Sequence, residues 1–431
     1  MRMTHSSLTD HIDAPESTPR LEKWLLPLIF RIVGPAPVRL VLGNGKGFSP
    51  PGVAPRFTMW IRDLRTLAEL LIDTEIAFGD AFVEGRIRVT GDLADFLEVV
   101  YASMGDAHRG PGWCSRALSR WIGFWQANTL EGSRHNIHSH YDLGNDFYRL
   151  WLDSQLVYTC AYFPSVSATL EEAQTAKLDY VCRKLRLQPG ETVIEAGCGW
   201  GALALHMARN YGVHVKAFNI SREQIRYARQ RADEEDLNDK VGFIEDDYRN
   251  VSGKFDAFVS VGMLEHVGAE NYPALGSVIH RTIGDRGRGL LHFIGRTQQS
   301  QFSPWIRKRI FPGAYVPALR EAMQVLEPFG YFVHDVEDLR PHYARTLEHW
   351  LDRFDKSASQ VLSTYGAEFE RAWRLYLAGS IAGFRTGTLQ LFQIHFAGSK
   401  YAPLPWTRAD LYTESSQARE SEAAEWIPAT S

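Results

Sequence analysis

Glu195, Gly197, Gly199 and Gly201 recur at every second position directly after the apolar pair at 193–194. A carboxylate at the end of a strand can accept hydrogen bonds from an ammonium group, and glycines let a backbone approach a ligand closely. The spacing differs from the dinucleotide fingerprint G-x-G-x-x-G, because an acid precedes the glycines and each glycine follows the last by two residues. No phosphate-binding lysine follows, so a P-loop is also excluded.

With both nucleotide loops excluded, the pattern favours the S-adenosylmethionine loop of Rossmann-like methyltransferases. Later segments supply further candidates for binding this cofactor. Asn219, Ser221 and Gln224 follow the second predicted strand, where neutral groups would have to bind the ribose hydroxyls. Asp247 and Tyr248 follow the third. We expect Asp247 to meet the exocyclic amine of adenine and Tyr248 to lie against the ring.

These candidates require strands that alternate with helices. Short apolar runs alternate with helical patterns throughout the second half of the chain, which predicts parallel βαβ units and an α/β fold of the Rossmann-like, doubly wound type. Ligands in such sheets bind at the carboxyl ends of the strands, where the candidates fall. The strands are expected at 192–195, 214–219, 241–245, 255–261 and 289–294.

Composition divides the 431 residues into two domains and two tails. The first twenty residues and the last seventeen are small, polar and rich in Ser and Pro or in acids, which indicates disorder. Between them we expect a small α+β domain, a linker that begins at a Gly-Pro-Gly break, and the larger cofactor-binding domain. The predicted boundaries are 1–20, 21–107, 108–136, 137–414 and 415–431.

The segment 21–33 is predicted to be a helix, although Pro27 interrupts it. Its apolar face can pack on its own domain or lie against a membrane surface, and the pattern leaves both open. The residues of that face are Leu21, Trp24, Leu25, Leu28, Ile29 and Ile32.

Composition also narrows the function classes. A net charge of −4 gives no electrostatic reason to expect a nucleic acid partner. The four cysteines are too few and too irregularly spaced for a disulfide framework or a zinc site, and no metal is expected. The polar start of the chain lacks the apolar core of a signal peptide, and no apolar run approaches the roughly 20 residues of a membrane span. A cytoplasmic location is therefore expected.

Five ordered segments resemble the cyclopropane-fatty-acid synthases and mycolic-acid methyltransferases, over residues 136–400. The N-terminal domain, residues 21–107, also resembles the small domain of the bacterial phospholipid-acting branch. The resemblance implies methyl transfer from S-adenosylmethionine to a cis double bond in a phospholipid acyl chain, at the inner face of the membrane, and a homodimer. The segments are 140–148, 157–163, 260–268, 290–295 and 305–313.

Family members hold a bicarbonate ion as the base that completes the reaction. The matching positions here are Cys160, Glu265, His292, the backbone of Ile294, and Tyr343. The resemblance implies that Glu265 accepts the bicarbonate proton, while His292 and Tyr343 donate to its oxygens. Cys160 is expected to have a positional role and no nucleophilic one.

The same resemblance adds Tyr158, Thr159 and Gly262 to the expected cofactor site, whereas His266 is interpreted as structural. Three other functions stay open. A relative with the same carbocation could give a methyl or methylene branch without a ring. The fold also suits a small-molecule methyltransferase or a lipid-binding protein without activity.

Overall fold

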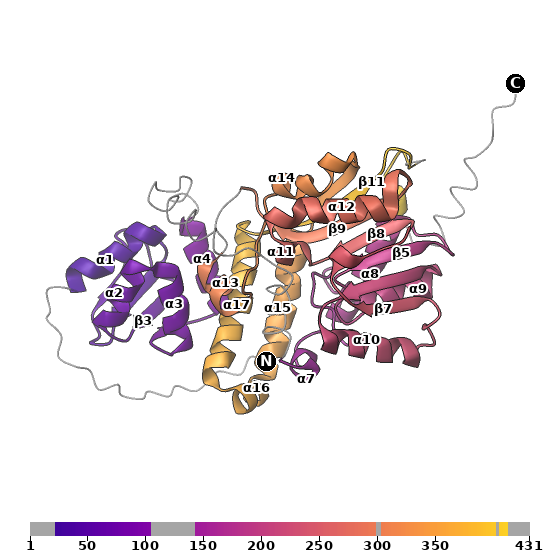
Figure 1. Ribbon diagram of the computed structural model, residues 1–431. Coiled ribbons are helices and arrows are strands. Elements are labelled where there is room, and N and C mark those ends of the chain that lie inside the picture. Colours follow the sequence, from indigo (N-terminus) through magenta and orange to yellow (C-terminus); the bar gives the residue numbers. More distant parts are fainter. Residues whose placement is uncertain (1–21, 105–142, 299–302, 402–404, 413–431) are drawn as a thin grey trace, which may run out of the picture. The chain divides into compact units, whose positions relative to one another are not determined.

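The structure is a computed structural model that describes residues 22–104, 143–298, 303–401 and 405–412 (Figure 1). Both predicted tails and the linker lie outside these residues. The chain divides into two compact units, and residues 358–386 group with the N-terminal part of the chain. That grouping did not follow from the sequence, and the domain boundaries stay a prediction. The first unit comprises 1–120, 303–305 and 358–386, and the second comprises 121–302, 306–357 and 387–431.

The first unit is α+β, with a four-stranded sheet in the order β2-β1-β3-β4. Strands β1 and β3 are parallel, and the other two pairs are antiparallel. The helix α17 packs along α4 and α3. The elements are α1 Glu22–Val33, β1 Val38–Leu42, β2 Gly47–Phe48, β3 Phe57–Ile61, α2 Leu64–Ile72, α3 Thr74–Val83, β4 Ile87–Val89, α4 Leu93–Met104, α16 Ala358–Tyr365 and α17 Ala367–Thr386.

The predicted helix at 21–33 forms as α1, but its buried stripe differs from the predicted one. Leu26, Ile29 and Val33 are buried, whereas Trp24 is 79% exposed. The buried residues are spaced by three and four, so they share one face of the helix. The helix therefore packs on its own unit through that face and leaves Trp24 at the surface.

The second unit is a Rossmann-like α/β domain, as predicted. Its seven-stranded sheet has the order β10-β11-β9-β8-β5-β6-β7, in which β11 is antiparallel to both neighbours and the other pairs are parallel. All five predicted strands form, and β6 and β7 have the predicted bounds. The strands are β5 Thr192–Ala196, β6 His214–Asn219, β7 Val241–Glu245, β8 Ala257–Val261, β9 Arg288–Gly295, β10 Phe332–Asp338 and β11 Gln390–Ala397.

Helices cover both faces of this sheet and enclose two cores (Figure 1). Apolar side chains of α8, α9 and α10 pack on one face, and those of α12 pack on the other. The helices and helical turns of the second unit are α7 Asn145–Arg149, α8 Leu170–Leu185, α9 Ala202–Tyr211, α10 Arg222–Glu234, η1 Tyr248–Asn250, α11 Leu264–Val267, η2 Ala269–Asn271, α12 Tyr272–Ile283, η3 Gly284–Arg286, α14 Leu319–Ala322, η4 Met323–Val325, η5 Glu327–Phe329, α15 Arg340–Lys356 and α18 Ala409–Tyr412. The helix α13 Pro304–Arg309 contributes residues to both units.

The described helices include none that is both long and apolar enough to cross a bilayer. The parallel strands β5 to β9 end at one edge of the sheet, so the loops that follow them converge there. That edge carries the glycine loop after β5 and the segments after β6, β7 and β8.

Candidate active site

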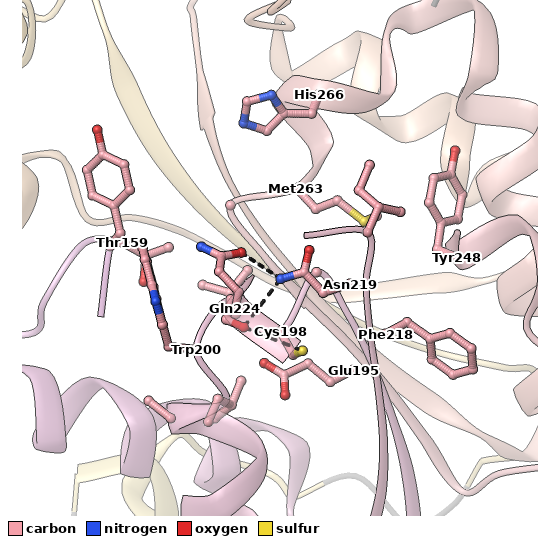
Figure 2. Close-up of a pocket in the computed structure, with 18 of the residues that line it drawn as sticks. Thr159, Glu195, Cys198, Trp200, Phe218, Asn219, Gln224, Tyr248, Met263 and His266 are labelled. Carbon is pink, nitrogen blue, oxygen red and sulfur yellow. Dashed lines mark hydrogen bonds between the residues drawn. The ribbon is translucent and has the colours of Figure 1, made fainter. Parts of the chain in front are cut away.

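A cavity lies at the carboxyl ends of β5, β6, β7 and β8 (Figure 2). Most of the residues predicted to bind the cofactor line it, but Gly201 and Ser221 do not. The predicted residues in the lining are Tyr158, Thr159, Glu195, Gly197, Gly199, Asn219, Gln224, Asp247, Tyr248 and Gly262.

The glycines of the loop have two different tasks. Gly199 has a φ of +53°, and a side chain there would project into open space with no atom within 4 Å. Gly201 has a φ of +86°, and its Cβ would lie 2.6 Å from the ring of Phe243 and 2.9 Å from Ala228 Cβ. Gly199 therefore leaves room for a ligand, whereas Gly201 allows the start of α9 to pack closely on its neighbours.

Glu195, the last residue but one of β5, is a buried carboxyl group that lacks a full set of partners. It is 3% exposed, and its Oε2 has no hydrogen-bond partner among the described residues. Burial raises the pKa of Glu195 to about 8, against the opposing effects of the Lys177 charge and of a hydrogen bond from the Ala204 amide. An ammonium group in the cavity would supply the missing partner and favour the carboxylate.

Asn219 and Gln224 bind each other at the end of β6. Asn219 Nδ2 donates to Gln224 Oε1 at 2.7 Å, and to the carbonyl oxygen of Gly199 at 3.3 Å (Figure 2). Ser221 instead caps α10, where its Oγ accepts from the Gln224 amide at 3.5 Å. The structure thus gives Ser221 a capping task outside the cavity lining and leaves the two amides for ribose hydroxyls.

Asp247 is buried and forms a bidentate ion pair with Arg249. Its Oδ1 accepts from Arg249 Nε at 2.8 Å, and its Oδ2 accepts from Arg249 Nη2 at 2.9 Å. Tyr248 lines the same end of the cavity, and burial raises its pKa to about 12. The bidentate ion pair fixes the orientation of the Asp247 carboxylate, while the neutral Tyr248 offers its ring to a ligand.

Tyr158 belongs to a cluster of aromatic side chains beside the cavity. Its ring centroid lies 5.6 Å from that of Tyr148, 5.2 Å from Trp151 and 5.3 Å from Trp350. Such rings exclude water and present negative π faces, which attract a nearby cation.

Glu265, His292 and Ile294 meet where β8 and β9 end. The amide of Ile294 donates to Glu265 Oε1 at 2.6 Å, and the amide of Gly262 donates to the carbonyl oxygen of His292 at 2.8 Å. Glu265 Oε2 and His292 Nε2 are buried without hydrogen-bond partners among the described residues. Burial raises the pKa of Glu265 to about 7, and burial with the charges of two lysines lowers the pKa of His292 well below its ordinary value. A carboxyl oxygen and an imidazole nitrogen are therefore both left to interact with a small polar group.

Cys160 and Tyr343 are linked through α15. Cys160 is fully buried, its Sγ donates to the carbonyl oxygen of Ala161 at 3.1 Å, and the Ala161 amide donates to Thr346 Oγ1 at 3.0 Å. Tyr343 lies one turn before Thr346 on the same helix and is also buried. Burial raises the pKa of the Cys160 thiol far above neutral pH. The thiol therefore stays protonated, and the positional role of Cys160 stays a prediction.

The model of the mycolic acid cyclopropane synthetase family matches residues 129–394. A probable fatty acid methyltransferase of Pseudomonas putida is 34% identical over 395 residues, which are 87% of this chain and 96% of that protein. The chain belongs to the mycolic acid cyclopropane synthetase family.

Two further matches define the family relationship. The cyclopropane-fatty-acyl-phospholipid synthase of Escherichia coli K12 is 39% identical over 259 residues, which are 60% of this chain and 66% of that protein. The crystal structure of the mycolic acid cyclopropane synthase CmaA1 with SAH and CTAB superposes with a TM-score of 0.58 at 32% identity, and covers 61% of this chain and 97% of that one. The protein is therefore an S-adenosylmethionine-dependent enzyme of the cyclopropane synthase type.

The cavity of this family member suits S-adenosylmethionine. The open position beside Gly199 leaves room for a ligand, and Glu195 Oε2 lacks the partner that the cofactor's ammonium group would provide. Two amide side chains in the lining, Asn219 and Gln224, suit the ribose hydroxyls, and the ring of Tyr248 suits the adenine base. The residues expected from the sequence thus fit the cofactor, apart from the two outside the lining.

Lys177 is a residue of the site that sequence reasoning missed. It lines the cavity, is 2% exposed, and its Nζ donates to Thr159 Oγ1 at 2.9 Å. Burial lowers the pKa of Lys177 to about 8, while the neighbouring groups Cys160, Asp153 and Glu195 oppose that shift. A lysine on the buried face of an amphipathic helix is the only sequence signal that could have identified it.

Two more residues of the lining, Arg249 and His266, were not predicted as ligands. Figure 2 shows His266 among the side chains around the cavity. Arg249 fixes Asp247 and lies over the ring of Tyr248, with its guanidinium carbon 5.5 Å from the centroid. Burial lowers the pKa of His266 to about 4, so its imidazole is neutral at physiological pH. The structural interpretation of His266 from sequence did not anticipate its place in the cavity.

Proposed function

We propose that this protein transfers a one-carbon unit from S-adenosylmethionine to the cis double bond of unsaturated phospholipid acyl chains and closes a cyclopropane ring. The cofactor supplies an electrophilic methyl group when bound. The alkene π electrons form the new carbon–carbon bond as the bond from methyl carbon to sulfur breaks, which leaves a carbocation on the lipid. Loss of one proton from the delivered carbon then closes the ring.

Several residues would serve the first half of this reaction. Glu195 would hold the cofactor through its ammonium group, and the backbone at Gly199 would let it lie close to the loop. An alkene is a poor nucleophile, so the methyl group must be held close to it and in line for transfer. The aromatic cluster around Tyr158 would exclude water and face the developing cation with π electrons.

The second half requires a proton acceptor in a dry site. We propose that Glu265, His292, Tyr343, Cys160 and the backbone of Ile294 surround a bicarbonate ion, which supplies that base. Glu265 would accept the proton of the bicarbonate hydroxyl group, while His292 and Tyr343 would donate hydrogen bonds to the other oxygens of the ion. The protonated thiol of Cys160 would help to fill the site.

A single observation carries this proposal. Two buried polar atoms, Glu265 Oε2 and His292 Nε2, have no partner in the described part of the chain, although burying such groups unpaired costs about 1–3 kcal/mol each. Bicarbonate has both a hydroxyl donor and acceptor oxygens, so one ion can satisfy a carboxylate and an imidazole together.

We further propose that the enzyme works at the inner membrane surface as a peripheral protein, with the lipid as its partner. The exposed Trp24 on α1 and the basic residues Arg307 and Lys308 on α13 support this proposal, because aromatic and basic side chains favour anionic lipid interfaces. A homodimer and the absence of a nucleic acid partner stay predictions.

The test uses purified protein, vesicles of cis-unsaturated phospholipid, bicarbonate and methyl-labelled S-adenosylmethionine. Label is followed into lipid, and the acyl chains are then examined by proton NMR. High-field cyclopropyl protons are expected. A ring and a methylene branch add the same mass, so mass spectrometry would not separate them. Cofactor binding without label in any lipid would overturn the proposal.

A branching methyltransferase is the second candidate. The relative that aligns over 96% of its own length is named a probable fatty acid methyltransferase, without mention of a ring. That chemistry needs the same carbocation, but removal of a different proton gives an alkene. Vinylidene protons in the labelled lipid would establish this candidate and exclude ring closure.

A further inference from the structure

A row of polar side chains, two of them buried and one half-buried, crosses three neighbouring strands of the large sheet. Gln393 on β11 pairs in register with His292 on β9 and with Glu337 on β10. Side chains at paired positions of adjacent strands lie on the same face. Gln393 is fully buried, and its Nε2 lies 2.9 Å from His292 Nδ1. The imidazole thus has a fixed amide neighbour behind it.

This contact indicates which nitrogen of His292 carries the hydrogen. An amide nitrogen has hydrogens and no available lone pair, so Gln393 Nε2 donates and His292 Nδ1 accepts. Burial keeps the imidazole neutral, since it lowers the pKa of His292 well below its ordinary value. A neutral imidazole with a bare Nδ1 carries its hydrogen on Nε2. That Nε2 is the buried atom without a partner among the described residues.

At the other end of the row, the negative charge of Glu337 is balanced by the ammonium group of Lys184. Glu337 Oε2 accepts from Lys184 Nζ at 2.5 Å and from the Tyr180 hydroxyl at 2.9 Å. The Glu337 carboxylate is therefore paired with a buried ammonium group. Gln393 lies between this ion pair and the imidazole, as a neutral spacer whose amide group faces His292.

We propose that Gln393 is a positioning residue that fixes His292 as the Nε2–H tautomer, so that the imidazole donates a hydrogen bond to an oxygen anion beside Glu265. The identity of that anion rests on the proposed function, whereas the tautomer does not. In this arrangement Glu265 is the acceptor of the site and His292 is a donor. A donor histidine stabilises the anion without competing for its proton.

The first test is spectroscopic and needs no substrate. Protein labelled with ¹⁵N at its histidines is examined by NMR between pH 6 and 8, and the His292 signals are identified by their loss in His292→Asn. A pyrrole-type Nε2 and a pyridine-type Nδ1 are expected, unchanged over this range. A protonated Nδ1 in the wild-type protein would overturn the proposal, whatever the variants do.

The second test changes the neighbour. In Gln393→Glu a carboxylate faces Nδ1, so we expect the proton to move there and Nε2 to lose its donor role. We expect kcat to fall on the order of 10²-fold, with KM for S-adenosylmethionine unchanged. The control is Gln390→Met, a partly buried glutamine on the same strand whose side chain lies on the opposite face; it should keep the tautomer and the rate.

The two tests separate this inference from the proposed function. Full turnover in Gln393→Glu with the proton moved to Nδ1 would remove Gln393 from the mechanism, even if the wild-type enzyme makes cyclopropane lipid. Wild-type protein that transfers no label to lipid but shows the Nε2–H tautomer would contradict the proposed substrate and leave the hydrogen bond in place.

Discussion

Lys177 donates a hydrogen bond from its buried Nζ to Thr159 Oγ1 at 2.9 Å, and so connects α8 to the segment that carries Tyr158 and Cys160. The ammonium group interacts electrostatically with Glu195 on the cofactor side and with Cys160 and His292 on the other. One buried cation therefore influences both halves of the site. Because a buried charge is costly unless it is paired, the arrangement favours neighbouring anions.

Lys177→Met is predicted to weaken cofactor binding. Loss of the cation removes the countercharge of Glu195, which would favour the neutral carboxyl and its weaker bond to an ammonium group. We expect the dissociation constant for S-adenosylmethionine to rise about tenfold, which corresponds to a loss of roughly 1.4 kcal/mol of binding free energy. Titration calorimetry measures this change.

The matched control is Lys184→Met. Lys184 is equally buried on the same helix, but it pairs with Glu337 outside the cavity. Both variants should be less stable than the wild type, and only Lys177→Met should bind the cofactor more weakly. Equal cofactor affinity in the two variants would show that Lys177 serves stability alone.

Glu265→Gln is predicted to keep cofactor binding and lose most turnover. Its amide oxygen can still accept from Ile294, but the side chain can no longer take a proton. We expect kcat to fall by at least about 10²-fold, measured as label transferred into lipid. Glu327→Gln, an exposed acid on the same unit, is the control. A wild-type rate for Glu265→Gln would exclude the carboxylate from the mechanism.

The rate is predicted to rise with pH around neutrality. Burial raises the pKa of Glu265 to about 7, and only its ionised form can accept a proton. We therefore expect kcat to fall about tenfold per pH unit below pH 7 and to level off above it. The measurement uses saturating cofactor, so that ionisation of Glu195 in the free enzyme does not contribute, and a constant bicarbonate concentration. A profile that is flat between pH 6 and 8 would contradict this role.

The fold of the second unit was largely predictable, because its strands combine apolar runs with loop residues at their ends. The strands β10 and β11 were missed. β10 lies at the sheet edge, and its three apolar residues are mixed with a histidine and three acids. None of its residues is buried, so it lacks the continuous apolar run of a central strand. Its partner β11 follows after α15, α16 and α17, at a separation that local patterns do not bridge.

The site was predictable where a motif gives a local signal. Glu195 and Gly199 follow from the loop, but Ser221 was assigned as a ligand from its position in a segment, and its N-cap hydrogen bond occupies it. Lys177 was missed because lysines on helices are usually exposed. The bond between Gln393 and His292 joins residues 101 positions apart, which only the sheet register brings together.

Glu195→Gln is predicted to bind S-adenosylmethionine more weakly than the wild type and to become more stable relative to the wild type as the pH rises. Burial raises the pKa of Glu195 from 4.5 to about 8, so the folded protein without cofactor favours the protonated carboxyl. Protonated Glu195 contributes its full stabilisation below pH 4.5. As the pH rises towards 8 this contribution is lost, because the carboxyl group ionises in the unfolded chain before it ionises in the folded protein. Glutamine cannot ionise. We therefore expect the melting temperature of the variant, relative to wild type, to increase by a few degrees between pH 5 and 8.

Differential scanning calorimetry without cofactor at pH 5, 6, 7 and 8 measures this difference, and titration calorimetry at pH 7.5 measures the binding. The dissociation constant for S-adenosylmethionine should rise about tenfold or more, since hydrogen bonds to charged groups contribute about 1.5–3 kcal/mol. A melting-temperature difference that stays constant with pH would show that the carboxyl of Glu195 is not held protonated in the fold. Unchanged binding would remove this carboxyl from the cofactor site.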